Sequence, residues 1–340
     1  MASKRLADLP KHDPLYHYLH QHVLPQIHSG VWNPEFRVFK MHNSNNDVYL
    51  YEEKASRIRV IGKFFIQHGR NSHEKARDRA QLEFNNLVWL RSLGFENSPH
   101  RIIRPYGCNQ DLNSVLIEEY CPGQPLSKFI TNAIRYKKEA ALYSCLTSLA
   151  WFLATLHNRT AQPNRVNFEL DSSYFFRLVK HVKNRPYVLS NWMEHRLSEL
   201  CWRWKEQPKM WEDQQVIVHG DATPSNFLFG QGNDVIAIDL ERMKWADRTF
   251  DLGRIAGELC HYFLQETGNK QGAEPFIGHF LWEYCCHFPD RYRAFDSITR
   301  RIPFHIAMTL LRVARNWWID LHHCNRLIEE AKSTLENYEN

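Results

Sequence analysis

No apolar run in this 340-residue sequence is long enough to cross a membrane. Stretches such as residues 302–311 are interrupted by His or Arg well short of the roughly 18 residues that a span needs. Residues 1–10 carry Lys4, Arg5 and Asp8 and contain no apolar core of a signal peptide, so we do not expect export. These absences predict a cytoplasmic protein without a membrane span.

Metal-binding cysteine patterns and nucleic-acid-binding motifs are also lacking. The eight cysteines are scattered, and their one close pair, Cys285-Cys286, does not have metal-ligand spacing, so we expect buried, reduced thiols. The net charge of +5 is spread evenly and accompanies no helix-turn-helix, finger or RNA-binding motif. We therefore expect no nucleic-acid partner, and a mild positive balance also suits a protein that binds nucleotide phosphates.

The length favours two lobes around a cleft, because single cores usually stop growing at about 250–300 residues. Residues 1–30 hold apolar residues at helical spacing and predict an extra helix packed on the body. Residues 48–66 alternate as two strands around a polar turn and predict a β-hairpin. On its second strand, Lys63 lies on the face opposite Val60 and Phe64, among apolar neighbours, where a lysine usually has an anionic partner.

A helix is predicted over residues 72–93, with Gly94 as its C-terminal stop. We expect its buried side to include Leu82, Val88 or Trp89, and Leu93. Two acidic residues of this helix, Glu74 and Glu83, could pair with Lys63, and the position of Glu83 before a run of leucines favours Glu83.

Two apolar runs, residues 102–103 and 114–117, are expected to complete a small antiparallel sheet. The segment from Glu118 to Gly123 breaks the pattern and marks the domain junction. Beyond it the periodicity is mainly helical, for example over residues 141–157, apart from a strand-loop-strand block at residues 216–240.

That block carries the residues suited to chemistry. A short strand leads into His219-Gly220-Asp221, the loop continues to Asn226, and Asp239 ends the next strand. A hairpin could place the side chains of Asp221, Asn226 and Asp239 together at one end of its strands. Phosphoryl transfer needs a carboxylate that orients and deprotonates a hydroxyl and oxygen ligands that hold Mg²⁺, and these three residues supply that set.

The motif His-Gly-Asp-x-x-x-x-Asn over residues 219–226, followed by Ile-Asp-Leu-Glu at 238–241 and Phe-Asp-Leu-Gly at 250–253, resembles the aminoglycoside phosphotransferase and choline kinase superfamily. This resemblance covers about residues 45–320. It implies an α+β, two-lobed protein-kinase-like fold with a small antiparallel N-lobe that holds one main helix, and a larger, mainly helical C-lobe. The implied divisions are an N-terminal helical extension (1–30), a nucleotide-binding N-lobe (31–117), a hinge (118–126) and the C-lobe (127–340).

By the same resemblance, the chain is an ATP- and Mg²⁺-dependent small-molecule kinase. It implies that Asp221 is the catalytic base and that Asn226 and Asp239 bind Mg²⁺. It also implies that Lys63 binds phosphate, with Glu83 as its helix partner. Finally, it implies that His219 and Asp251 brace the loop and that the carbonyl of Glu118 and the amide of Tyr120 meet the adenine. The family's phosphate lid falls at residues 40–47, which contain no glycine, although Ser44 offers a hydroxyl.

Several alternatives remain open for the acceptor and for the activity. Only 11 residues separate Asp239 from Asp251 and no Ala-Pro-Glu motif follows, which leaves little room to dock a peptide and favours a sugar, amino sugar, cyclitol or amino alcohol. Glu241 leans the choice slightly towards amino alcohols. The glycine-free lid equally motivates a nucleotide-binding pseudokinase or scaffold without turnover.

Aromatic residues and histidines raise two further alternatives. An aromatic box for a quaternary ammonium is conceivable, but tryptophans at helical spacing are more often core. The tryptophans concerned are Trp192, Trp202, Trp204, Trp211, Trp317 and Trp318. His322-His323 could suggest a metal site, but surface histidines are expected, because no suitably spaced ligands accompany them.

Overall fold

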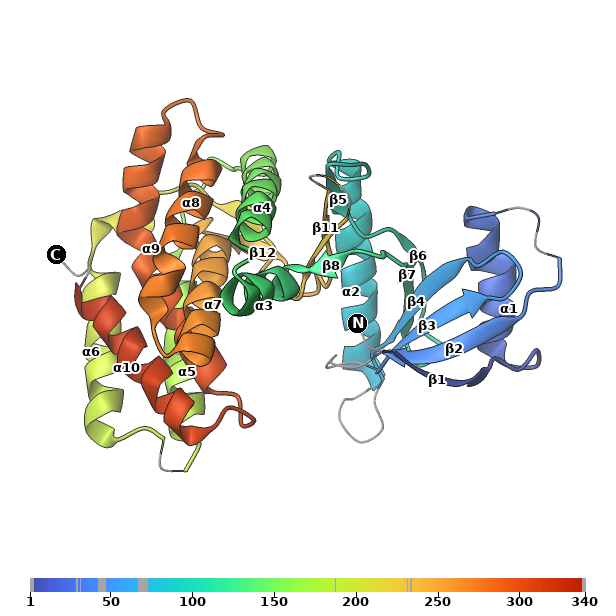
Figure 1. Ribbon diagram of the computed structural model, residues 1–340, viewed down its shortest axis with the longest axis horizontal. Coiled ribbons are helices and arrows are strands. Elements are labelled where there is room, and N and C mark those ends of the chain that lie inside the picture. The colour runs from blue at the N-terminus through green and yellow to red at the C-terminus, as the bar shows by residue number, and fades with distance from the viewer. Residues whose placement is uncertain are drawn as a thin grey trace. The chain divides into compact units, whose positions relative to one another are not determined.

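The computed structural model describes residues 3–28, 30, 32–41, 47–66, 73–186, 188–230, 232 and 234–337. The chain forms two compact units (Figure 1). The first comprises Met1–Gly123 and Ile236–Glu241, and the second comprises Gln124–Val235 and Arg242–Asn340.

The first unit is built on a six-stranded antiparallel sheet in the order β1-β2-β3-β4-β7-β6. Its elements are β1 (Ser3–Asp8), α1 (Pro14–Tyr18), η1 (Leu19–Val23), η2 (Leu24–Gln26), β2 (Phe36–Met41), β3 (Asp47–Glu53), β4 (Arg59–Phe64), α2 (His73–Ser92), β5 (His100–Ile102), β6 (Pro105–Asn109) and β7 (Val115–Glu119). The predicted hairpin is β3 and β4, and the predicted helix over 72–93 is α2.

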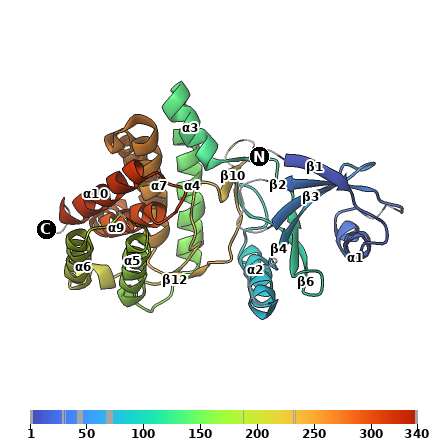
Figure 2. The ribbon, with the colours of Figure 1, turned by 90° about the horizontal axis from the view of Figure 1, so that it is seen from below.

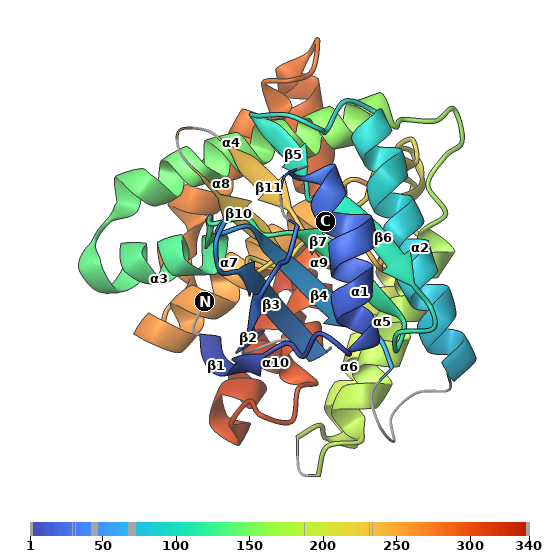
Figure 3. The same ribbon diagram turned by 90° about the vertical axis from the view of Figure 1, so that its right-hand side faces the viewer.

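Period-two alternation decides what each face of this sheet carries. Val60 and Phe64 of β4 join a core cluster that also contains Leu19 and Val23 from the N-terminal helical segment. Figure 3 shows α1 over the sheet. Lys63, which points to the other face, meets Glu83 of α2 instead. The expected N-terminal helix is thus present and packed, but β1 precedes it and extends the sheet.

The second unit is mainly helical. Its elements are β8 (Gln124–Pro125), α3 (Leu126–Tyr136), α4 (Glu139–Arg159), α5 (Phe168–Lys183), α6 (Asn191–Lys205), η3 (Pro208–Trp211), β9 (Val216–Val218), β10 (Phe227–Phe229), β12 (Lys244–Ala246), α7 (Thr249–Thr267), η4 (Lys270–Ala273), α8 (Glu274–Cys285), α9 (Arg291–Ala314) and α10 (Leu321–Asn337), while β11 (Val235–Ala237) runs across the boundary between the units. Helix α9 packs against α5, α7 and α10 (Figure 2).

Helix α4 is the one described helix with the length and hydropathy of a membrane span, and 61% of its apolar window is buried. Its buried side includes Leu142, Leu146, Leu149 and Leu153, as expected of a core helix. All eight cysteines are free thiols, and most are buried, as predicted.

Candidate functional site

In the first unit, the ammonium group of Lys63 lies among carboxylates. Its Nζ is 2.8 Å from Oε2 of Glu83, 3.0 Å from Oε1 of Glu83 and 2.6 Å from Oδ1 of Asp239. The Lys63 side chain is 8% exposed and that of Glu83 is fully buried. Burial alone would lower the pKa of Lys63, but the nearby carboxylates of Glu83 and Asp239 raise it well above its ordinary value. The lysine is therefore a fixed, buried cation.

Helix α2 presents Glu83 on its buried face, between small residues and leucines. Ala76, Ala80, Leu87 and Leu90 are fully buried and recur at the helical period with Glu83. The predicted buried side was wrong, because Leu82, Val88 and Trp89 are 40–53% exposed. Alanines at positions 76 and 80 bring the helix close to the sheet, which lets the Glu83 carboxylate reach Lys63. Glu74, the competing partner, is exposed.

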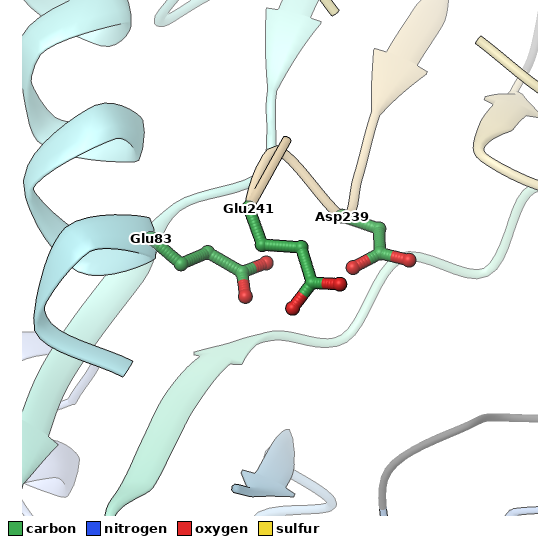
Figure 4. Close-up of side chains that lie close together, drawn as sticks. All are labelled: Glu83, Asp239 and Glu241. Carbon is green, nitrogen blue, oxygen red and sulfur yellow. The ribbon is translucent and has the colours of Figure 1, made fainter. Parts of the chain in front are cut away.

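The segment after β11 adds two further carboxylates. Asp239 has a φ of 63°, a left-handed conformation that is uncommon outside glycine. Asn86 of α2 holds this turn by donating from Nδ2 to the Leu240 carbonyl at 3.1 Å. Oxygen atoms of Glu83, Asp239 and Glu241 all lie within 4.8 Å of one another (Figure 4), and Arg79 pairs with Glu241 at 2.6 Å. The turn therefore gathers hard oxygen donors beside Lys63.

The side chain of Glu118 adds another carboxyl group near Lys63, which the sequence did not indicate. It lies in β7, its carboxyl group is buried, and Oε1 has no hydrogen-bond partner within the described part of the chain. Burial raises the pKa of this carboxyl to about 7, although nearby Lys63 opposes the rise. Tyr120 follows the strand and packs its ring under the guanidinium of Arg59. Ser44, the predicted lid residue, lies outside the described residues.

In the second unit, a backbone turn places the loop that follows β9. Gly220 has a φ of 77°, and a Cβ there would lie 1.9 Å from the carbonyl oxygen of Arg242, so the position requires glycine. Asp251, at the start of α7, accepts the backbone N–H groups of His219 at 2.6 Å and Gly220 at 3.1 Å. Asp251 also lies 3.3 Å from Nε2 of His157, at the end of α4. Helices α4 and α7 therefore hold this turn.

The same loop carries Asp221 and Asn226. Asn226 donates from Nδ2 to the backbone carbonyl of Asp221 at 2.9 Å, which orients its amide oxygen away from that contact. The ring of His219 packs against Phe227, and its Nδ1 accepts the N–H of Asp221 at 3.4 Å. Oδ1 of Asp221 accepts a hydrogen bond from Nη2 of Arg312 at 2.5 Å. Arg312 belongs to α9, and no motif in the sequence pointed to it.

Comparison with known protein families identifies the family of the chain. The phosphotransferase enzyme family matches residues 36–283, which is well over half of the chain. The chain belongs to this family. The predicted resemblance is therefore confirmed, and the matched residues contain both groups of side chains described above except Arg312.

Individual phosphotransferases are similar at lower identity. An aminoglycoside 3'-phosphotransferase of Acinetobacter baumannii is 25% identical over 119 residues, which span 34% of this chain and 44%, less than half, of that relative. An ethanolamine kinase of Plasmodium vivax has a similar structure, with a TM-score of 0.58 and 14% identity over 95% of this chain and 88% of that one. An ADP-bound aminoglycoside phosphotransferase gives a TM-score of 0.58 and 12% identity over 93% and 98%. These structural likenesses confirm the predicted protein-kinase-like fold.

Three of the six tryptophans considered for an aromatic box each face a different lysine. Lys205 stands 4.5 Å over the ring of Trp202, and Lys209 stands 4.7 Å over that of Trp204. A third lysine, Lys332, stands 5.5 Å over the ring of Trp192. These three rings therefore each face a cation already, whereas Trp317 and Trp318 pack against each other.

One histidine of the His322-His323 pair is not a surface residue. His323 is 5% exposed, and its Nε2 lies 3.0 Å from Nδ1 of His261. Burial lowers the pKa of His261 to about 4, so this pair is neutral. The expectation of surface histidines was therefore wrong for His323, which lies on α10 and packs against His261 of α7.

Proposed function

We propose that this chain transfers the γ-phosphoryl group of ATP to a hydroxyl group of a small molecule. The observation that carries the proposal is the loop after β9, where Asp251 fixes the turn that presents Asp221. A carboxylate on a rigid loop can accept the proton of an attacking hydroxyl, which is the main covalent task that phosphoryl transfer leaves to the protein. Membership of the phosphotransferase enzyme family agrees with this chemistry.

In this proposal Lys63 binds the phosphates of ATP, and Glu83 holds it in place. The short distances from Nζ to the Glu83 carboxylate support that assignment, because they fix a flexible side chain in one position. Glu118 and Tyr120 would meet the adenine through backbone groups, Ser44 would belong to the phosphate lid, and His219 would brace the loop.

The residues present fit Mg²⁺, which prefers oxygen ligands and usually binds through one or two carboxylates and substrate phosphates. We assign Asp239 and Asn226 as its protein ligands. Asp239 lies among carboxylate oxygens, and the amide of Asn226 is oriented by its bond to Asp221. When bound, Mg²⁺ neutralises charge on the phosphate oxygens.

The acceptor is a sugar, amino sugar, cyclitol or amino alcohol in this proposal. The short segment between Asp239 and Asp251 supports a small acceptor, since it holds only β12 and a turn before α7 begins. The similar proteins include an ethanolamine kinase and aminoglycoside phosphotransferases, whose names describe two of these classes. We expect the enzyme to work in the cytoplasm.

A second candidate is nucleotide binding without turnover. The specific observation that favours it is the bond of 2.5 Å between Arg312 and Asp221, because a base held by a guanidinium must share its oxygens with the acceptor hydroxyl. Tight binding of Mg·ADP without any ATP-dependent product would support this candidate.

A screen separates the two candidates. The purified chain is incubated with ATP and Mg²⁺ and with each member of a panel of sugars, cyclitols, amino alcohols and aminoglycosides, and ADP release is read together with the phosphorylated product. We expect one acceptor class to give ADP and product in equal amounts. ADP release without product, at the rate seen without acceptor, would argue against a small-molecule kinase.

A further inference from the structure

Two glycines bring helices α7 and α9 into close contact beside Asp221. A Cβ at Gly253 would lie 2.3 Å from the Cβ of His305, and one at Gly257 would lie 2.6 Å from the Cβ of Thr309. The residues that follow these glycines on α7 are Arg254 and Glu258. Close packing therefore places both charged side chains in the interior, next to Arg312 on α9.

Guanidinium groups from several elements surround the Asp221 carboxylate. Arg312 donates to Oδ1 of Asp221 at 2.5 Å and lies 3.5 Å from Oε1 of Glu258. Nε of Arg242 lies 3.9 Å from Oδ2 of Asp221. Arg315, at the end of α9, is partly buried, which lowers its pKa, and it also feels the charges of Arg312 and Arg242. Together with Arg254, these residues make a group of four arginines that faces the carboxylates of Asp221 and Glu258.

Arg254 is a buried cation with unused donors. It is 1% exposed, and neither Nε nor Nη1 has a hydrogen-bond partner in the described part of the chain. Its guanidinium carbon lies 5.5 Å from the ring centroid of Phe250, and its positive charge lowers the pKa of Tyr174 on α5. A buried guanidinium without a paired anion is unfavourable, so its retention needs an explanation outside folding.

Tyr174 reports the same excess of positive charge. Burial raises the pKa of a phenol, yet Arg254, Arg315 and Arg312 together lower that of Tyr174 below its ordinary value. The positive field beside Asp221 therefore exceeds the effect of burial.

We infer that the acceptor carries an anionic group, a carboxylate or another oxyanion, bound by Arg254, Arg312 and Arg315 beside the hydroxyl that Asp221 activates. This inference rests on the proposed function and deepens it. Arg312 and Arg315 are partly exposed, so a ligand can reach them, while the buried Arg254 adds positive charge from beneath. An amino alcohol or amino sugar would instead bring a cation to a site with surplus cations, which disfavours those acceptors.

The phosphates of ATP are the other possible source of an oxyanion. We assign the arginines to the acceptor because Arg312 and Arg242 lie directly beside Asp221, the proposed base that the acceptor hydroxyl must reach. The nucleotide has its own cation in Lys63 of the first unit. The two sources predict different competition with ADP, which the experiment measures.

Sulfate is the probe, since it is an oxyanion that does not titrate near neutral pH. The thermal midpoint of the full chain is measured with sodium sulfate and with sodium chloride at equal ionic strength, in the wild type, in Arg315→Gln and in Arg300→Gln. Arg300 is the matched control, because it is an exposed arginine of α9 that pairs with Asp296 away from Asp221. We expect sulfate to raise the midpoint of the wild type and of Arg300→Gln, and to raise that of Arg315→Gln much less.

Equal shifts in all three proteins would reflect the general effect of sulfate on protein surfaces and would overturn the inference. The titration is then repeated with saturating Mg·ADP. Sulfate binding that persists supports an acceptor site, whereas sulfate that competes with ADP would assign the arginines to nucleotide phosphates.

Turnover supplies the last comparison. D-glucuronate, D-glucose and D-glucosamine present similar rings with a negative, neutral or positive substituent. We expect the highest kcat/KM for the anion, and in Arg315→Gln a KM for the anion that is raised about tenfold or more with the KM for ATP unchanged. Preference for D-glucosamine would overturn the inference and leave the proposed function intact. Sulfate binding without any turnover would overturn the proposed function and leave the anion-binding site intact.

Discussion

The two units hold ionisable groups in opposite balance. In the first unit one lysine lies among several carboxylates, whereas in the second unit arginines gather around the carboxylate of Asp221. An acidic surplus suits cations, and a basic surplus suits anions. The difference suits two tasks of phosphoryl transfer, since the carboxylates of the first unit would contribute to metal binding and the arginines of the second unit would hold an anionic acceptor.

The largest loss of stability is expected when the single lysine among the carboxylates of the first unit is removed. Lys63→Met leaves the buried carboxylate of Glu83 and the partly exposed carboxylate of Asp239 without their cation, which typically costs about 3–5 kcal/mol. Urea unfolding of the first unit should report the loss. Lys54→Met is the matched control, because Lys54 also bridges two carboxylates, Asp8 and Glu35, but at the surface, so its midpoint should barely move. Equal losses in both variants would break the comparison.

Glu118 should make the stability of the first unit depend on pH. Burial raises the pKa of its carboxyl from 4.5 to about 7. The stability that this carboxyl contributes is therefore fully present below pH 4.5 and is lost as the pH rises through 7. Between pH 5 and 8, Glu118→Gln should gain up to about 3 kcal/mol in unfolding free energy relative to the wild type, at about 1.4 kcal/mol per pKa unit. A difference between the two proteins that does not change with pH would contradict this account.

A smaller effect of the opposite sign is expected in the second unit. Arg254→Met removes a buried cation whose Nε and Nη1 have no partner in the described residues, so stability should rise by about 1 kcal/mol. The thermal midpoint measures this change. A loss comparable to that of Lys63→Met would mean that Arg254 is needed for folding, and the contrast between the units would then be lost.

The smallest effect is expected at the edge of the acidic group. Arg79 pairs with Glu241 at 2.6 Å, but its side chain is 41% exposed, so water already screens the pair. Arg79→Gln should change the unfolding free energy by at most about 0.5 kcal/mol. A larger loss in urea unfolding would show that the rim of this group is as tightly coupled as its centre.

Motifs made much of the site predictable from the sequence. The loop from His219 to Asn226 has residue types and spacing that the chemistry demands, and Glu83 was favoured over Glu74 by its position before the leucines. The roles assigned to these residues stay predictions. The fold class followed from the resemblance and is confirmed by the comparisons.

Other features could not be predicted, because their signal lies in packing. The buried face of α2 was misjudged, since two alanines and a glutamate share it with Leu87 and Leu90 while Leu82, Val88 and Trp89 remain exposed. Strand β1 was missed, because residues 3–8 alternate only weakly. Arg254, Arg312 and Arg315 share no motif, and only the close packing of α7 and α9 brings them to Asp221.

The most direct test of the account measures phosphoryl transfer by Asp221→Asn. On the best acceptor of the panel, with saturating ATP and Mg²⁺, we expect kcat to fall by about 10²–10⁴-fold while Mg·ADP binding stays at the wild-type level. Asn keeps the size of the side chain and removes the oxygen that accepts the proton. Wild-type kcat in this variant would contradict the assignment of Asp221 as the base.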